Sequence, residues 1–398
     1  MREDPSPLAL VLSGGGARGA YELGVLRHAL GALATKLGER ARPRIFCGTS
    51  VGAINACALA ANFDAPDLGL ARISEKWLSL HLDDVFRLGW GDLAGMAAWL
   101  LGRERPGGPQ SVLDATPLAK MVRDVIPWRS LHQAVAEQRI DGVCVSATDI
   151  ETGHTVVFVE SEVNGFGSRD RAVDWSKVRL TAQHALASAA IPIVFPAVRV
   201  GGRMFTDGSL RQNTPIAPAL RLGAGRVLVI GLRTRRAARA GRQTSTDQRA
   251  YASPLYLFGK VLDALLLDRV EHDLGNLRQV NQALTALQMV SPIAIGQEPI
   301  AAAMEAAGGG MRPVRDFFIR PSQDLGALAA EVLRRPSVRA RLGGPAGYLL
   351  RKLGEGAEPS DLVSYLLFDG EYTKELLALG ESDARRHSDQ LEEFLTAA

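Results

Sequence analysis

The sequence is poor in cysteine and lacks a long uninterrupted hydrophobic run. Its three cysteines, Cys47, Cys57 and Cys144, lie in apolar stretches. This pattern is typical of buried small hydrophobic residues in a reducing compartment, and it argues against a disulfide framework. The apolar run at 8–12 is too short for the core of a signal peptide. No window reaches the roughly 20 apolar residues of a membrane-spanning helix. We therefore expect a cytoplasmic protein. Any contact with a membrane would be peripheral.

An excess of charge of one sign is also lacking. The chain has 46 basic and 43 acidic residues and a formal net charge of +3, which is too balanced to imply nucleic acid, so we expect no nucleic-acid partner. The spacing of histidine and cysteine shows no metal-site pattern, so we expect no metal and no cofactor. With 398 residues, 46% of them hydrophobic, the chain is long enough for one large globular domain plus an extension.

The first sixty residues alternate between strand and helix patterns. The all-apolar run at 8–12 ends in a serine and three glycines, and leucines then recur every three or four residues up to Gly38. A second strand is predicted at 44–47 and a second helix at 53–61. This βαβα order predicts a three-layer α/β/α fold with a mainly parallel central sheet. Further strands are expected at 142–147, 155–159, 198–205 and 227–232, and Thr116-Pro117 marks a helix start.

The rest of the chain has a different composition. Residues 233–253 are rich in arginine without an apolar period, which indicates a loop or linker. Residues 254–398 are expected to be mainly helical, with helices at 255–287 and 361–379. The stretch 85–108, with two tryptophans and arginines at its end, fits a lid or membrane-surface element and a core helix equally well.

The stretch "IFCGTSVGAINA" drives a β-type run into a glycine-flanked serine and then into a helix of small residues. In a nucleophile elbow the serine occupies such a strand-to-helix turn, and the flanking positions must be small. Gly48, Ser50 and Gly52 meet this requirement. Taken alone, the pattern favours an ordinary tight turn.

The glycine loop "GGGARG" after the first strand has two interpretations. Gly14, Gly16 and Gly19 satisfy the dinucleotide-binding fingerprint, which also requires an acidic residue at the end of the second strand. Here Glu39 precedes that strand, and the strand ends in Gly48 instead. The alternative is an oxyanion hole, in which residues without bulky side chains leave backbone N–H groups pointing into a cavity.

Three motifs in order resemble the patatin-like phospholipase family. They are the glycine-rich loop "SGGGARGAYELGVL", the nucleophile motif "GTSVGA" and the D-G motif in "MFTDGSLRQNTP". The stretches "VSATDIETG" and "ASAAIPIVFPAV" are also similar to the family. The resemblance covers about residues 8–232, and it therefore suggests that 1–232 form the catalytic domain.

The resemblance implies a Ser-Asp dyad in which Asp207 takes the proton from Ser50 directly, without a histidine. The amides of Gly15, Gly16 and Ala17 would form the oxyanion hole. Arg18 would support that loop or bind an anionic headgroup. The implied substrate is a phospholipid or lysophospholipid, cleaved through an acyl-enzyme intermediate, and the oligomeric state is not predicted. The sequence departs from the family in Ser209, where glycine or alanine is preferred, and in Ser13, where the plant proteins carry aspartate.

The residues themselves support parts of this interpretation and leave alternatives open. An aspartate with an ordinary pKa of about 3.9 is a weak base, so Asp207 would need desolvation, which the apolar segment 191–195 could provide. A Ser-Asp-His triad would use His272 or His387. A nicotinamide-dependent oxidoreductase and a non-catalytic membrane-binding scaffold are the alternatives from other classes. Asn213 is expected to tie the loop below the dyad.

Overall fold

The computed structural model describes residues 6–89, 113–163, 172–192, 194–234, 270–294, 313–354 and 361–396. Most of the expected lid segment at 85–108 and most of the arginine-rich stretch at 233–253 lie outside these ranges. So does the first part of the helix expected at 255–287. Its described part is the helix α13 (Val270–Ala294).

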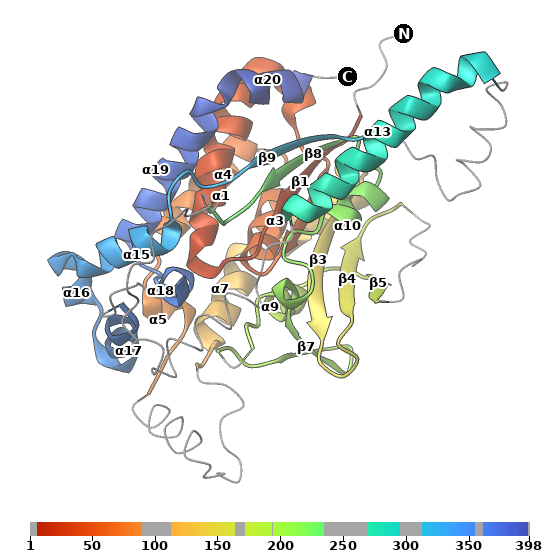
Figure 1. Ribbon diagram of the computed structural model, residues 1–398. Coiled ribbons are helices and arrows are strands. Elements are labelled where there is room, and N and C mark those ends of the chain that lie inside the picture. The colour runs from red at the N-terminus through yellow and green to blue at the C-terminus, as the bar shows by residue number, and fades with distance from the viewer. Residues whose placement is uncertain are drawn as a thin grey trace, which may run out of the picture.

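A mainly parallel sheet forms the centre of the molecule (Figure 1). Within the described ranges its main path runs β5-β4-β3-β2-β1-β8-β9. β4 and β7 run antiparallel to β3, and β6 pairs with β7. The strands are β1 (Leu8–Leu12), β2 (Ile45–Thr49), β3 (Gly142–Asp149), β4 (Thr155–Glu160), β5 (Val173–Lys177), β6 (Val198–Val200), β7 (Arg203–Asp207), β8 (Arg226–Ile230) and β9 (Arg315–Ile319).

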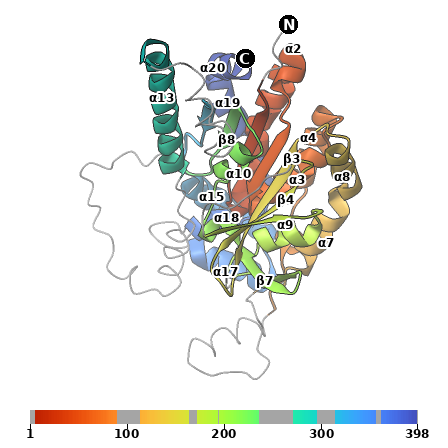
Figure 2. The same cartoon turned by 90° about the vertical axis from the view of Figure 1, so that its right-hand side faces the viewer.

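Helices cover both faces of the sheet, which confirms the expected three-layer α/β/α fold (Figures 1 and 2). The alternation of side chains along β1 shows the two layers. Leu8, Leu10 and Leu12 point into the larger core, whereas Ala9 and Val11 belong to a smaller core. Every residue of β1 is apolar and buried. Both faces of the sheet are therefore apolar at this strand, as expected of a central parallel strand.

The helices divide unequally between these two cores. The smaller core is closed by α10 (Ile216–Arg221) and α13. The larger core packs against the remaining helices. They are α1 (Ala20–Leu26), α2 (Leu33–Leu37), α3 (Val51–Ala61), α4 (Pro66–Leu78), α5 (Leu82–Val85), α7 (Thr116–Val125), α8 (Trp128–Ala136), α9 (Ala182–Ser188), α15 (Leu325–Arg334), α16 (Pro336–Arg341), α17 (Gly344–Gly354), α18 (Asp361–Leu366), α19 (Gly370–Arg386) and α20 (Ser388–Thr396). Short helical turns are η1 (Gly16–Gly19), the π-type segment η2 (Arg27–Ala32), η3 (Gly38–Ala41) and η4 (Gly208–Leu210).

Two expected elements are broken in the structure. The single strand expected at 198–205 is wrong: Gly201 and Gly202, with φ of 55° and 86°, turn the chain between β6 and β7. Glycine occupies such left-handed positions without steric cost. The single helix expected at 361–379 is also wrong, because it is interrupted between α18 and α19. Asp369 begins α19 by accepting a hydrogen bond from the Glu371 amide at 2.9 Å.

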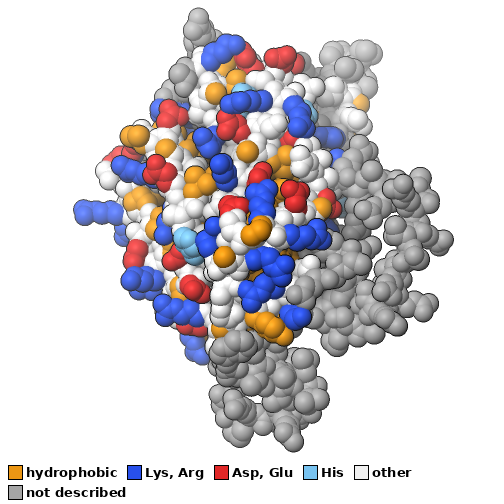
Figure 3. Space-filling model, turned by 90° about the vertical axis from the view of Figure 1, so that its left-hand side faces the viewer, with side chains coloured by type: hydrophobic (Ala, Val, Ile, Leu, Met, Phe, Trp, Pro, Cys, Tyr) orange, Lys and Arg blue, Asp and Glu red, His pale blue; other side chains and the backbone are white. Residues whose placement is uncertain are grey.

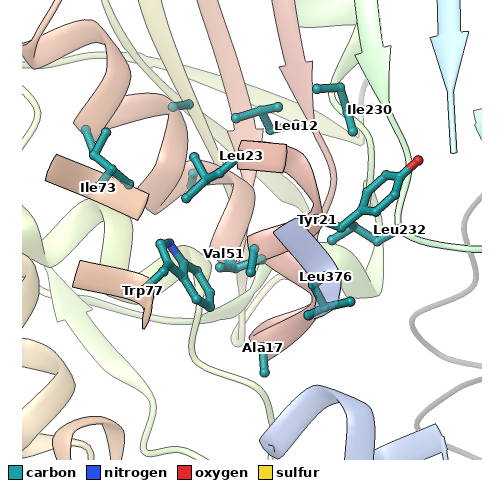
Figure 4. Packing of buried hydrophobic residues seen from close by; sticks show 14 of the residues in the cluster. Leu12, Ala17, Tyr21, Leu23, Val51, Ile73, Trp77, Ile230, Leu232 and Leu376 are labelled. Atoms are coloured by element: carbon teal, nitrogen blue, oxygen red, sulfur yellow. The ribbon is translucent and has the colours of Figure 1, made fainter. Parts of the chain in front are cut away.

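The C-terminal region is joined closely to the first half of the chain. β9, which the sequence analysis did not predict, extends the sheet beside β8. α19 packs along α1, and the buried Tyr21 hydroxyl donates to Asp383 at 3.1 Å. Figure 4 shows Leu376 of α19 in the same cluster as Tyr21 and Leu232. The described residues on both sides of position 232 therefore share one sheet and contribute to both of its cores.

The outer face of this C-terminal layer carries many arginines interspersed with acidic residues (Figure 3). Arg335 donates to Glu375 at 2.9 Å, and Arg341 donates to both Asp369 and Glu371. These ion pairs link α16 to α19. None of the described helices is both long and apolar enough to cross a membrane.

Candidate active site

The turn from β2 into α3 holds Ser50 in a rare backbone conformation. Its φ of 55° and ψ of −126° lie in a region that residues with side chains seldom adopt. The flanking glycines explain how the turn closes. A Cβ on Gly48 would lie 2.2 Å from the Gly52 carbonyl oxygen, and one on Gly52 would lie 2.5 Å from the Leu12 carbonyl oxygen. The G-x-S-x-G spacing thus follows from backbone contacts on both sides of the serine.

Asp207, at the end of β7, accepts a hydrogen bond from Ser50. The Ser50 hydroxyl lies 2.7 Å from Oδ2 of Asp207, and both side chains are buried. The other carboxyl oxygen, Oδ1, accepts from the Ser209 amide at 2.8 Å. The backbone of Asp207 is held from two sides, since its N–H donates to the Ala190 carbonyl at 2.9 Å and its carbonyl accepts from Thr148 Oγ1 at 3.0 Å.

Burial changes the acid–base properties of Asp207. Loss of solvation raises the pKa of this carboxyl to about 6, while hydrogen bonds from Ser50 and Ser209 act in the opposite direction. A carboxylate with this pKa is still ionised at neutral pH and binds a proton more readily than an exposed aspartate does. A hydrogen-bonded serine and a carboxyl of raised pKa fit the pattern of a nucleophile with its base.

The glycine loop between β1 and α1 passes directly beside Ser50. A Cβ on Gly14 would lie 2.1 Å from Ser209 Oγ and 3.1 Å from Ser50 Cβ. A Cβ on Gly16, whose φ is 58°, would lie 2.3 Å from the Tyr365 carbonyl oxygen. The loop continues through Gly15 and the buried Ala17 into the helical turn η1. Close contacts within the protein therefore account for Gly14 and Gly16 without a bound dinucleotide.

Arg18 points away from solvent, although it carries a charge. It is 4% exposed, its Nε donates to Ser364 Oγ at 2.7 Å, and its guanidinium lies 4.1 Å from the centre of the Tyr365 ring. Both partners belong to α18, far along the chain. This placement favours the loop-supporting interpretation of Arg18 over the binding of a headgroup.

A largely apolar pocket opens beside Ser50. Its walls come from α3, α4 and α7, from the segment after α9, and from the α18 region. Trp77 stacks with Phe368 at a ring distance of 6.2 Å, and Figure 4 shows Trp77 beside Val51. The lining residues are Gly16, Ser50, Val51, Ile54, Asn55, Ala58, Ile73, Lys76, Trp77, Leu80, Val85, Leu118, Met121, Val122, Val125, Ile126, Ala189, Ile191, Phe195, Tyr365 and Phe368. Such a pocket suits a hydrocarbon chain better than a polar substrate.

The loop after Asp207 is tied to the ends of two strands, β1 and β2. Thr49 Oγ1 donates to the Gln212 carbonyl at 2.9 Å, and the Thr214 and Ser13 hydroxyls lie 2.8 Å apart. The Gly14 amide donates to the Asn213 carbonyl at 3.2 Å. Asn213 thus takes part in fixing the loop through its backbone, as well as lying against Gly14 through its side chain.

The two histidines considered for a triad lie elsewhere. His272 is exposed on α13, and His387 follows α19, where its Nδ1 lies 2.9 Å from the Asp383 carbonyl. In the part of the chain that the structure describes, the hydrogen-bond partners of Ser50 and Asp207 include no histidine. Across the same residues, no group of three or more His, Cys, Asp or Glu side chains is placed to hold a metal ion.

Sequence reasoning missed two features beside the site. Ser188, at the end of α9, contacts the Ser50 backbone, and its only sequence signal is a serine within "ASAAIP". The second feature is a buried polar group, in which Asn55 donates to Glu22 at 2.8 Å and accepts from Trp77 at 3.2 Å. Burial raises the pKa of Glu22 well above its usual range. Asn55 also donates to the Gly19 carbonyl at 3.1 Å, and so joins η1 to the pocket wall.

The fold and the site together define the class of the protein. It is an α/β/α protein with a serine on a strained strand-to-helix turn beside an apolar pocket. The model of the patatin-like phospholipase family matches residues 10–220, which is more than half of the chain. The chain therefore belongs to the patatin-like phospholipase family, and hydrolysis of lipid acyl esters is the activity that this family supports.

Comparison with solved structures finds distant similarities. The chain is 13% identical to human GIVD cytosolic phospholipase A2 in complex with an inhibitor, with a TM-score of 0.42. The alignment covers 99% of the present chain and 60% of the phospholipase chain. It is 12% identical to VipD from Legionella pneumophila, with a TM-score of 0.31, covering 94% and 67%. The match to the ExoU-SpcU complex from Pseudomonas aeruginosa has 16% identity and a TM-score of 0.28, and it covers 96% of the present chain and 76% of the matched chain. No curated protein sequence matches the chain. The family assignment thus rests on the family match and its motifs, because these TM-scores are too low to add to it.

Proposed function

We propose that the protein is a lipid acyl hydrolase of the phospholipase A or lysophospholipase type, acting through a dyad of Ser50 and Asp207. The observation that carries this proposal is the 2.7 Å hydrogen bond between Ser50 Oγ and the buried Asp207 carboxyl. The apolar pocket at the same serine supports a substrate with a hydrocarbon chain. An unassisted serine is a poor nucleophile at neutral pH, so the paired base is the feature that a hydrolase requires.

In the first half-reaction the Ser50 oxygen attacks the ester carbonyl carbon while Asp207 accepts the hydroxyl proton. The carbonyl electron pair moves onto oxygen, and this oxyanion is stabilised by the amides of Gly15, Gly16 and Ala17. The intermediate collapses, the carbon–oxygen bond to the leaving alcohol breaks, and the proton held by Asp207 passes to that alcohol. Ser50 is left as an acyl ester.

In the second half-reaction water attacks the acyl-enzyme. Asp207 accepts a proton from the water, and the same amides again hold the oxyanion. Collapse releases the fatty acid and returns the proton to Ser50 Oγ. Attack by an alcohol in place of water would give transacylation by the same steps. Arg18 acts in this scheme only by supporting the glycine loop through its contacts with Ser364 and Tyr365.

We further propose that residues 1–232 supply the reacting groups, and that the mainly helical region 254–398 completes the pocket. Tyr365 and Phe368 line the pocket and belong to that region. The proposed substrates are phospholipids and lysophospholipids. The proposed location is the cytoplasm, with peripheral contact to a membrane surface during catalysis.

The test is fatty-acid release from phospholipid, lysophospholipid and short-chain ester substrates by the purified protein, beside Ser50→Ala and Asp207→Asn. We expect release by the parent and loss of at least about 1,000-fold in each variant, as for other paired nucleophiles and bases. Activity that survives in Ser50→Ala would rule out the dyad mechanism. A parent that binds vesicles and hydrolyses no ester would favour the scaffold alternative.

A further inference from the structure

Ser188 links the nucleophile to the sheet through a single hydroxyl group. The Ser50 amide donates to Ser188 Oγ at 2.8 Å, and Ser188 Oγ in turn donates to the Ser146 carbonyl at 2.6 Å. Ser188 is fully buried. Because a hydroxyl has one proton to donate, and here donates it to Ser146, the lone pairs of Ser188 face the Ser50 amide. The orientation of this hydroxyl is therefore fixed by its two partners.

Two residues further along, the same segment holds the base. The Ala190 carbonyl accepts from the Asp207 amide at 2.9 Å and from Thr206 Oγ1 at 2.7 Å. Segment 188–190 thus contacts the backbone of both members of the proposed dyad. Ser146, the other partner of Ser188, lies beside the base as well, since a Cβ on Gly208 would be 2.2 Å from its carbonyl oxygen.

We propose that Ser188 is a positioning residue, which holds the Ser50 backbone in its left-handed conformation and so keeps Oγ directed at Asp207. This inference rests on the proposed function for its effect on the reaction rate, and on the geometry alone for its effect on the Ser50 backbone. A backbone conformation of this kind persists only when the surrounding structure fixes it. The hydrogen bond to the Ser50 amide supplies such a restraint at the strained residue itself.

The same contact limits which amides can act on the substrate. The Ser50 N–H is occupied by Ser188, so it is not free to donate to an oxyanion. This agrees with the proposed donors, the amides of the neighbouring glycine loop at Gly15, Gly16 and Ala17. Ser188 therefore separates the amide that orients the nucleophile from the amides that stabilise the intermediate.

The chain contains a matched control for this contact. Ser161 is a second buried serine that accepts from an amide, that of Val163 at 3.0 Å, and donates to a carbonyl, that of Asp141 at 2.5 Å. It lies beside Gly142, at the start of β3, away from the dyad. Ser161→Ala removes the same two kinds of hydrogen bond as Ser188→Ala does, one from an amide and one to a carbonyl. A purely structural role predicts equal effects of the two substitutions on stability and none on turnover.

The experiment compares Ser188→Ala, Ser188→Thr and Ser161→Ala in the full chain, with rates expressed per active site titrated by a fluorophosphonate. We expect kcat of Ser188→Ala to fall about 10- to 100-fold, the effect of a small misplacement of reacting groups. KM and the midpoint of the acid limb of the pH profile should stay at the parent values. Ser188→Thr, which keeps the hydroxyl, should recover most of the rate, and Ser161→Ala should keep the parent kcat.

Hydrogen exchange at the Ser50 amide provides a readout that does not need turnover. We expect faster exchange in Ser188→Ala and parent-like exchange in Ser161→Ala. If Ser188→Ala does not fold, Ser188→Cys, whose thiol is a weaker hydrogen-bonding group, replaces it and should show a smaller change in the same direction.

Two outcomes would overturn the inference: a parent-like kcat in the Ser188 variant, or an equal loss in Ser161→Ala. If the parent hydrolyses no ester, the proposed function fails, and amide exchange alone decides the inference. In that case equal exchange at Ser50 in the parent and the Ser188 variant would overturn it.

Discussion

The two ends of strand β3 use the same hydrogen-bond pattern for different purposes. At its start, Ser161 links the Val163 amide to the Asp141 carbonyl, and the nearby Arg44–Asp141 ion pair lies partly in solvent. Toward its other end, Ser188 links the Ser50 amide to the Ser146 carbonyl beside a buried carboxyl. At this end Ser50, a non-glycine residue at positive φ, lies beside Asp207, a buried carboxyl of raised pKa. Near the start, Gln138 also has a positive φ of 55°, and its carbonyl accepts a hydrogen bond from Arg44.

The comparison shows which end of β3 contains groups that cost free energy of folding. A buried ionised carboxylate and a left-handed serine both cost free energy, and they persist because the surrounding backbone is fixed by many contacts. Neither member of the proposed dyad lies at the start of β3. Substitutions matched between the two ends should therefore separate effects on activity from effects on stability.

The largest contrast is expected from alanine at the two glycines of this strand region. In Gly208→Ala the new Cβ would meet the Ser146 carbonyl oxygen at 2.2 Å, and the backbone next to Asp207 must move. We expect kcat to fall by about 100-fold or more, because the base loses its alignment. In Gly142→Ala the nearest atom is Ser161 Cβ at 2.9 Å. That variant should lose stability and keep kcat, as steady-state kinetics and thermal unfolding together would show. Equal loss of kcat in both variants would contradict the contrast.

The second prediction concerns the pH dependence of ester hydrolysis. A base acts only when ionised, so kcat/KM should fall about tenfold per pH unit below the pKa of Asp207. With that pKa raised to about 6 by burial, the acid limb should have its midpoint near pH 6. Ser161→Ala should leave the midpoint in place. A midpoint near that of an exposed aspartate would show that another group is the base.

The third prediction compares two carboxyls in their effect on stability. Because the folded-state pKa of Asp207 is raised above the unfolded value of about 3.9, the folded protein binds the proton more tightly. Protonation of Asp207 therefore adds to the free energy of unfolding, on the order of 3 kcal/mol at most. This stabilisation is fully present below about pH 4 and is lost as the pH rises through about 6. Asp207→Asn should therefore gain stability relative to the parent between pH 4 and pH 7.

Asp141→Asn is the control at the start of β3. The Arg44–Asp141 pair at 2.6 Å is partly exposed, so its loss should cost less than about 1 kcal/mol at neutral pH. Denaturant titrations at several pH values would measure both variants. A parent-like pH dependence in Asp207→Asn would mean that Asp207 is not the group whose proton is linked to folding.

The smallest effect is expected at Ser209. Its side chain and its amide both hydrogen-bond Asp207 and lower the pKa of that carboxyl. Ser209→Ala keeps the hydrogen bond from the backbone amide and removes the one from the hydroxyl, so the pKa of Asp207 should rise. The acid limb should then move to higher pH, and kcat/KM near pH 6 should fall a few-fold. Rate profiles of Ser209→Ala and Ser161→Ala measured side by side would show whether the shift is specific to the hydroxyl next to the base. A shift to lower pH would have the wrong sign.

The sequence predicted those parts of the fold that have a local signal. β1 was predicted at its observed bounds, because five consecutive apolar residues are what a strand buried on both faces requires. β9 was missed, since "RDFFI" carries two charges and lies between helical stretches. The β6–β7 turn was missed because a glycine pair within a β-type run was read as part of a strand.

The site shows the same division. The elbow has a local signature in its G-x-S-x-G spacing, although only Gly48 is required by a contact within the turn, with Gly52; Gly52 is required by the backbone of Leu12 on the neighbouring strand. The proximity of Ser50 to Asp207 was inferred from the family resemblance and not from spacing. The contacts of Ser188 with Ser50 and of Arg18 with Ser364 join residues 138 and 346 positions apart. No pattern in a single sequence reports such long-range pairs, which depend on how the layers pack.

The contacts at Tyr365 bear on how this protein can diverge from its relatives. Its carbonyl oxygen fixes a glycine at position 16, its ring stacks on Arg18, and its side of the pocket lies outside the residues that match the family. One wall of the pocket is therefore built by a part of the chain that the family match does not cover. The family motifs alone do not specify the shape of this pocket.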